Sequence, residues 1–241
     1  QKRQRMERHY IFIIVAKRKV AQDLISLTKQ LKVLAGVRWS WQEATAETKT
    51  ISTQSSNKGE PIKNTAISPR LGLVYQLNYT ISMFSSYSNS FIPNTGITIN
   101  KEPLSPSLID QYEIGIKKDF FKKMISTNIT LYQIVNSNLA QTAEFKADGS
   151  SNTDTNVKIL SGETTSKGIE IDILSKPVEG LNIMAGYSYN DMRYTKTNGA
   201  MGSFIQGERV IRTPDHTANF SFFYTIPSGK LKNFSFGTII N

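Results

Sequence analysis

Two acidic residues are the first candidates for chemistry in this sequence. Glu170 and Asp172 are two residues apart in an alternating segment, so their side chains share one face of a β-strand. Paired carboxylates could act as a general acid and a general base. Catalysis would also need a nucleophile or a group that orients the pair, and the sequence offers neither. We therefore predict that both carboxylates are solvated charges and that the protein is not an enzyme.

Ligands for a metal ion are equally scarce. The chain has no cysteine and two histidines far apart in sequence, which excludes thiolate and multi-histidine sites. His216 lies in Pro214-Asp215-His216-Thr217, where we expect it to serve a transition from turn to strand. Residues 199–207 contain glycines, but their spacing is not that of a phosphate-binding loop and no helix follows. The sequence predicts no catalytic residue, no metal site and no resident cofactor.

The net charge raises the question of an anionic partner. It is formally +10 at pH 7, and such an excess can indicate nucleic-acid binding. Much of it lies in residues 1–20, where Glu7 is the one acidic residue among Lys2, Arg3, Arg5, Arg8, Lys17, Arg18 and Lys19. No nucleic-acid-binding motif follows. We interpret residues 1–20 as a separate basic N-terminal stretch and expect no nucleic-acid partner.

From about residue 21 onward, apolar residues recur at every second position, which is the period of a β-strand. The clearest segment alternates Leu181, Ile183, Ala185, Tyr187 and Tyr189 with polar or small residues. Such segments occur in five pairs: near 21–27 and 31–41, 71–77 and 81–87, 112–117 and 125–131, 169–173 and 181–189, and 218–226 and 234–236. The pattern predicts about ten antiparallel strands and no helix.

The connections between the strands have two very different lengths. Turns within a pair take roughly three to six residues, whereas the connections 42–68, 92–110, 141–165 and 196–215 take about twenty or more. A soluble β-sandwich tends to have modest loops at both ends. Long loops on one side and tight turns on the other are typical of a barrel in an outer membrane.

A membrane location also explains the two faces of the strands. In lipid, every backbone N–H and C=O must be paired within the protein, and a closed barrel achieves this. The apolar face would contact acyl chains, while Arg38, Glu113 and Glu170 would line a water-filled lumen. Tyrosine and tryptophan near strand ends suit an interfacial girdle, although cross-strand packing would explain any one of them. We predict an all-β fold: an antiparallel transmembrane β-barrel.

About ten strands would leave two unpaired edges in lipid, with rows of unsatisfied backbone groups. The last alternating segment stops near residue 241 without a further turn, and residues 1–20 do not alternate. We therefore expect an incomplete segment, of about ten strands, from a larger barrel.

Several short motifs accompany this pattern. They include Ala21-Gln22-Asp23-Leu24, Ser68-Pro69-Arg70-Leu71-Gly72-Leu73-Val74-Tyr75, Gln111-Tyr112-Glu113-Ile114-Gly115-Ile116-Lys117, Ser166-Lys167-Gly168-Ile169-Glu170 and Thr213-Pro214-Asp215-His216-Thr217. In this order and spacing, residues 21–241 resemble the C-terminal barrel half of TonB-dependent siderophore receptors of the ferrichrome-receptor-like group. The resemblance implies a 22-stranded barrel with a plugged lumen. Residues 1–20 do not match what precedes this region in the family, and the sequence lacks the plug, the TonB box and the closing strands.

The resemblance also implies a function and its partners. The protein would be a receptor in the bacterial outer membrane that takes up a ferric siderophore, with energy from the TonB, ExbB and ExbD complex acting through the plug region. Its other partner would be outer-membrane lipid. Iron would arrive already chelated, so no cofactor is expected. Cations and aromatic rings on the long loops would attract an anionic or hydroxamate chelate, and the candidates are Phe91, Arg193, Tyr194, Phe204, Arg209 and Arg212.

Other functions remain compatible with the pattern. A passive porin-type barrel or an outer-membrane enzyme barrel would share the alternation, and a TonB-dependent receptor for cobalamin or a glycan would share the motifs as well. A soluble β-sandwich binding module would share the alternation but not the lipid contact.

Overall fold

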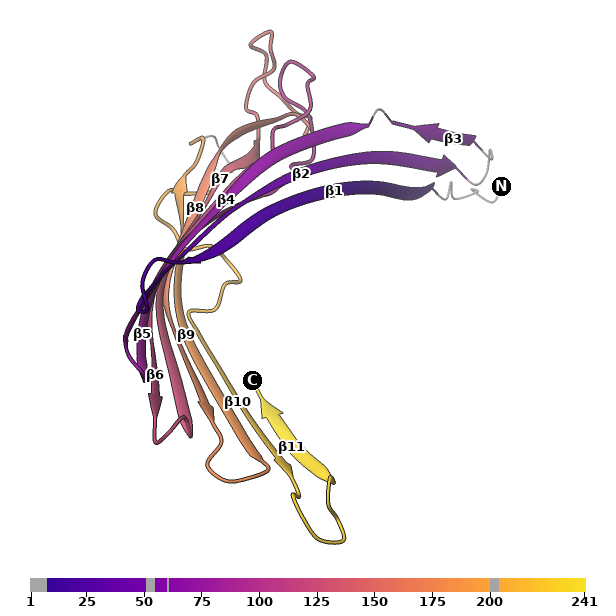
Figure 1. The fold of residues 1–241 in the computed structure, drawn as a ribbon. Coiled ribbons are helices and arrows are strands. Elements are labelled where there is room, and N and C mark those ends of the chain that lie inside the picture. The colour runs from indigo at the N-terminus through magenta and orange to yellow at the C-terminus, as the bar shows by residue number, and fades with distance from the viewer. Residues whose placement is uncertain (1–7, 51–54, 60, 200–203) are drawn as a thin grey trace.

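The strands form one antiparallel sheet in the computed structural model, which describes residues 8–50, 55–59, 61–199 and 204–241. They are β1 (Arg8–Ser26), β2 (Leu31–Thr50), β3 (Ser55–Lys58), β4 (Ile62–Asn78), β5 (Ile81–Ile92), β6 (Ser107–Phe120), β7 (Ile125–Thr142), β8 (Lys158–Ser175), β9 (Leu181–Lys196), β10 (His216–Thr225) and β11 (Ser235–Ile240). Ten of them pair in chain order, and β3 pairs with β2. The sheet curves into an arc, with long loops at one end and short turns at the other (Figure 1). Among the described residues, no helix is long and apolar enough to span a membrane.

The five predicted strand pairs are confirmed, but some strands are longer than the alternation indicated. β1 begins at Arg8 rather than near residue 21, and it pairs with β2 along its whole length. The connection expected at 42–68 is mostly strand, since β2 runs to Thr50 and β4 begins at Ile62. These extensions lie on the side of the long loops. In β1 the extension contains consecutive apolar residues at 10–16, so a search for alternation does not detect it.

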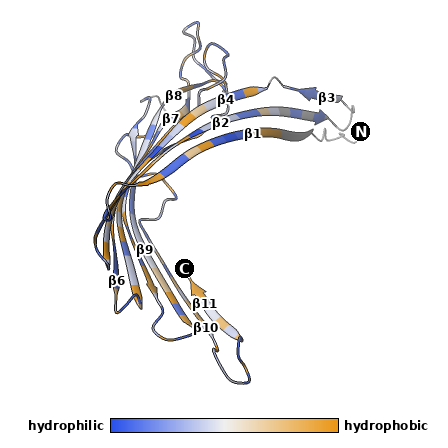
Figure 2. Ribbon diagram, viewed as in Figure 1, coloured by the Kyte–Doolittle hydropathy of each residue, from blue (hydrophilic) through white to orange (hydrophobic). Residues whose placement is uncertain are grey.

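The two faces of the sheet differ as predicted. Ile114, Leu131 and Ile169 lie side by side across β6, β7 and β8, and Leu131 is 53% exposed. The neighbouring row on the opposite face contains Gly115, Thr130 and Glu170. Orange and blue residues alternate along the strands accordingly (Figure 2).

No second layer covers the apolar face within the described part of the chain. Its strands form a single sheet, and the buried hydrophobic residues are Leu104, Ala143 and Tyr194, all near the long loops. A soluble sandwich would bury its apolar face against another sheet. The structure therefore contradicts the sandwich alternative and agrees with a barrel wall whose apolar face meets lipid.

Aromatic rings gather at two levels on the apolar face. On the long-loop side, the ring centroids of Tyr87 and Tyr112 lie 5.1 Å apart, and those of Tyr189 and His216 lie 5.2 Å apart. On the short-turn side, Tyr224 packs edge-on against a neighbouring phenylalanine. From His216 to Tyr224 the strand rises by about 27 Å. Because barrel strands tilt by roughly 35–45°, this length corresponds to about 20 Å across the membrane, within the roughly 25 Å apolar band of outer-membrane barrels.

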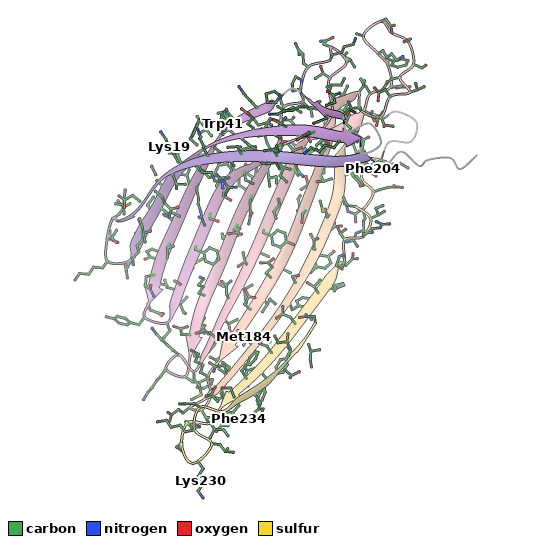
Figure 3. The ribbon with its side chains drawn as sticks, turned by 90° about the vertical axis from the view of Figure 1, so that its right-hand side faces the viewer. Lys19, Trp41, Met184, Phe204, Lys230 and Phe234 are labelled. Carbon is green, nitrogen blue, oxygen red and sulfur yellow. The ribbon has the colours of Figure 1, made fainter. Side chains whose placement is uncertain are left out.

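The opposite, concave face is the lumen wall, and Figure 3 shows Met184 on it. Two aromatic side chains there lie flat across glycines of the neighbouring strand. A Cβ atom at Gly115 would overlap the Phe84 ring, and one at Gly168 would overlap the Tyr132 ring. The absence of a side chain at these glycines lets the rings lie against the wall.

The facing of the strands predicts unequal effects of the same substitution at adjacent positions of β7. Ile129→Arg would place a charge on the apolar face and should lower the free energy of unfolding by about 2–4 kcal/mol in lipid. Asn128→Arg, on the lumen face near Asp172, should change it by less than about 1 kcal/mol. Urea titration of the protein folded in lipid vesicles measures both values. Equal destabilisation by the two variants would contradict the assignment of the faces.

Candidate ligand-binding site

The end of β9 and the connection 204–215 form the best-defined site near the long loops. The connection folds back beside β9 as an extra ribbon. Tyr194 donates its backbone N–H to the Glu208 carbonyl at 2.9 Å and accepts from the Gly207 N–H at 2.7 Å. Arg193 and Arg209 pair in an antiparallel bridge. Four residues predicted from sequence, Arg193, Tyr194, Phe204 and Arg209, are thus brought together.

Two of these four residues form an aromatic wall. The rings of Tyr194 and Phe204 are stacked, with centroids 4.2 Å apart and an angle of 7° between the planes. Tyr194 is 7% exposed, and Phe204 is half exposed. Phe204 is labelled at the long-loop end of the concave view (Figure 3). Both rings border a cavity of about 430 Å³, whose other walls include Pro93, Asn136, Leu139, Lys158, Thr164 and Met192.

The cavity also contains polar groups that the protein does not satisfy. The Oδ1 atom of Asn136 and the Oγ1 atom of Thr164 are buried without a hydrogen-bond partner among the described residues. Lys158 adds a cation at the rim. A buried polar atom without a partner is costly, so these atoms provide hydrogen-bonding positions for a bound molecule. An aromatic wall with a few convergent polar groups is a common form of ligand site.

The loops beside the cavity support each other. Loop 93–106 meets loop 143–157 through a parallel bridge between Ile97 and Val157, and Leu104 beneath it is 2% exposed. The two loops stand together at one end of the sheet (Figure 1). The two loops that border the cavity therefore contact and support each other.

The arginines of the site have partners within the protein. The Nε atom of Arg193 donates to Asp191 at 3.0 Å, and its Nη1 atom donates to the Gly207 carbonyl at 3.0 Å. Arg209 forms an ion pair with Asp215 and lies 3.7 Å from an Asp191 oxygen. The hydrogen bond to Asp215 raises the pKa of the Arg209 guanidinium, with burial acting in the opposite direction. These arginines hold the connection against β9.

The remaining two predicted residues lie apart from this cavity. Phe91 is the penultimate residue of β5 and borders a separate cavity of about 240 Å³ with Arg38 and Trp41. Arg212 is exposed and has a left-handed φ of 63°. The role of all six residues in ligand binding stays a prediction.

The other candidates for chemistry lie on both faces of the sheet. His216 accepts or donates a hydrogen bond through Nδ1 to the Tyr187 hydroxyl at 2.8 Å, and it lies on the apolar face. Among the described residues, no three His, Cys, Asp or Glu side chains form a possible metal site. Glu170 and Asp172 are exposed on the lumen wall. The glycine-containing segment 199–207 lies partly outside the described residues.

Sequence reasoning missed Asn136 and Thr164. Their strands, β7 and β8, pair in a register that shifts after Asn136, where the strand bulges toward Leu139. Asn138 within the bulge has a left-handed φ of 58°. Asn136 and Thr164 are ordinary polar residues at lumen-facing positions, and nothing in the sequence distinguished them before the register was known.

Comparison with known proteins gives a consistent result. The sequence model described as "TonB dependent receptor-like, beta-barrel" matches residues 16–239. The ferric-pyoverdine 358 receptor of Pseudomonas putida is 27% identical over 180 residues, which are 75% of this chain and 20% of that protein. The ferrioxamine B receptor of Salmonella typhimurium is 28% identical over 172 residues, 71% of this chain and 23% of that protein. The chain thus spans about a fifth of the length of these relatives.

Solved structures share the fold. The alcaligin outer-membrane receptor FauA of Bordetella pertussis superimposes with a TM-score of 0.67 and 21% identity, over 95% of this chain and 37% of FauA. The siderophore receptor PiuA of Acinetobacter baumannii gives a TM-score of 0.71 and 17% identity, over 95% of this chain and 36% of PiuA. The described sheet is therefore part of a barrel wall of this type.

The ion pairs of the site predict how the connection 204–215 is held. Asp215→Asn removes the charged partner of Arg209 and should increase the rate of proteolytic cleavage within 204–215 by about two- to fivefold. Glu179→Gln is the control, because Glu179 lies in a turn at the opposite end and makes no ion pair among the described residues. Equal cleavage rates in both variants and the parent would show that the ion pairs do not hold the connection.

Proposed function

This chain belongs to the TonB-dependent receptor-like β-barrel family, and on that premise we propose that its protein takes up a ferric siderophore across the bacterial outer membrane. The sheet lies in that membrane, with its apolar face toward lipid. The chain supplies part of the barrel wall and part of the extracellular entrance. Energy would come from the TonB, ExbB and ExbD complex acting through a plug region outside this chain.

The cavity beside Tyr194 and Phe204 carries the assignment within the chain. It opens at the long-loop end, where a molecule from the medium arrives first, and it combines stacked rings with the unpartnered oxygens of Asn136 and Thr164. A ferric chelate presents the same mixture, since apolar linkers join polar metal-binding groups at its surface. Aromatic faces and fixed hydrogen-bonding positions recognise such a molecule by shape.

No covalent step is needed for this function. The family consists of receptors and transporters, and we propose that this protein likewise has no enzymatic activity. Iron is the cargo and enters inside its chelate, so the protein needs no resident cofactor. A porin-type barrel and a receptor for cobalamin or a glycan are the alternatives that the uptake experiment separates.

The experiment compares the parent strain with a strain that lacks the complete gene. Under iron limitation, the parent should accumulate radiolabelled iron from at least one of ferrioxamine B, ferrichrome and ferric pyoverdine, and deletion of either this gene or tonB should abolish that uptake. Iron uptake that needs this gene but not tonB would indicate a porin. Loss of cobalamin or maltodextrin uptake with unchanged iron uptake would contradict the siderophore assignment.

Tyr194→Ala tests the cavity itself. Loss of the stacked ring should weaken the apparent affinity for the transported chelate by about three- to tenfold. Tyr79→Ala is the matched control, because Tyr79 is 97% exposed in the short turn between β4 and β5. If both variants bind the chelate as the parent does, Tyr194 is not part of the binding site.

A further inference from the structure

Three arginines form a diagonal row on the lumen face of β1, β2 and β4. In the sheet register, Arg18 opposes Ser40 and Arg38 opposes Val20, so these two arginines are diagonal neighbours. Arg38 in turn opposes Ser68, while Arg70 opposes Gly36. Diagonal neighbours across strands lie about 7–8 Å apart, within reach of long side chains. The three guanidinium groups therefore belong to one stretch of the wall.

These arginines differ from those of the loop site in having no acidic partner. Arg18, Arg38 and Arg70 take part in no ion pair among the described residues, whereas Arg193 and Arg209 both do. Glu113 borders the same stretch and adds one negative charge against three guanidinium groups; its carboxylate accepts hydrogen bonds from Ser86 at 2.9 Å and from Gln111 at 2.5 Å. The row keeps a local excess of positive charge.

Two adjoining cavities open onto the row. One has a volume of about 450 Å³ and is bordered by Arg38, Arg70 and the hydroxyl groups of Ser68, Ser86, Ser88 and Ser90. The other, of about 240 Å³, is bordered by Arg18, Arg38 and Ser90. Arg38 and Ser90 border both. Apart from Ser86, whose hydroxyl donates to Glu113, these serines place further hydroxyl donors beside the guanidinium groups.

Two hydrogen-bond donors that border the larger cavity are buried and have no partner among the described residues. Ser68 is 4% exposed, yet its Oγ atom has no hydrogen-bond partner among the described residues. The Nε atom of Arg38 is also buried without a partner there. Buried polar atoms of folded proteins nearly always have a partner. A donor on a guanidinium beside a hydroxyl donor matches an oxygen atom that carries negative charge, because charge-assisted hydrogen bonds of this kind are among the strongest.

We propose that Arg38 and Arg70, with Ser68 between them and Arg18 at the margin, form a binding site for carboxylate groups on the lumen wall. The inference rests on the proposed function in one respect, because it assigns the carboxylates to the transported chelate. Planar guanidinium groups bind carboxylates in a bidentate manner. The site selects iron chelates that bear free carboxylates over uncharged ones. Its residues lie on β1, β2 and β4, which β5 to β8 separate from β9 in the sheet (Figure 1).

The test uses the full-length receptor, purified in detergent, and the variant Arg38→Gln/Arg70→Gln. Binding of metal-free citrate, ferric citrate and the uncharged chelate ferrichrome is measured by titration calorimetry. Lys32→Gln is the control, because Lys32 occupies an even-numbered position of β2 like Arg38 and its substitution removes one positive charge nearer the short turn. Affinity of the double variant for both citrate probes should fall by about ten- to a hundredfold. Its ferrichrome affinity, and all affinities of Lys32→Gln, should match the parent.

Several results would overturn the proposal. The proposal fails if the parent receptor binds neither citrate probe. It also fails if the double variant binds citrate as tightly as the parent does. An equal loss of citrate and ferrichrome binding would show that the arginines maintain structure rather than select carboxylates. Arg38→Lys separates charge from geometry, since it keeps the charge and should recover only part of the citrate affinity. If the receptor takes up no iron chelate but still binds citrate through Arg38 and Arg70, the proposed function fails and the site stands.

Discussion

The backbone of a membrane-spanning sheet must satisfy all its hydrogen bonds within the protein, and the rest of this structure depends on that constraint. Each strand from β1 to β11 pairs with its chain neighbour, so the ladder is continuous across the sheet. With the backbone fixed in this way, side chains alternate between two solvents. Leu131 meets lipid, and Thr130 next to it faces the lumen. Binding groups can therefore occur at every second position of a strand without disturbing the apolar surface.

Much of the fold could be predicted from the sequence, because the alternation is strongest where each strand has lipid on one side. The spacing of three isoleucines in β8 predicted both the strand and the face that is apolar: Ile169, Ile171 and Ile173. Residues 8–20 of β1 could not be found in this way, because a run of consecutive apolar residues at 10–16 followed by basic residues carries no period of two. The loop site was partly predictable. Tyr194 and Phe204 have types suited to a chelate, but the pairing of Arg193 and Arg209 with Asp191 and Asp215 depends on how the connection folds back. Asn136 and Thr164 form the last pair before the register of β7 and β8 shifts, and their pairing is known only from the structure.

The two binding sites proposed on the lumen wall differ in their chemistry. The cavity at β9 offers stacked rings and unpartnered oxygens, which suit a bulky neutral surface. The carboxylate site proposed on β2 and β4 offers guanidinium and hydroxyl donors, which suit negative charge. A chelate with both features could contact both regions, and the difference between them gives the wall a means to distinguish substrates by charge. The acidic residues Glu170 and Asp172 are exposed on the same lumen wall.

Site-directed spin labelling along β7 tests the two-solvent account most directly. This part of the protein contains no cysteine, so single cysteines placed one at a time at positions 125–132 can each carry a label in the receptor embedded in lipid. Collisions with oxygen, which concentrates in lipid, should peak at 125, 127, 129 and 131, and collisions with a water-soluble nickel complex should peak at the even positions. Accessibility to both reagents that varies without a two-residue period, or oxygen peaks at the even positions, would contradict the account.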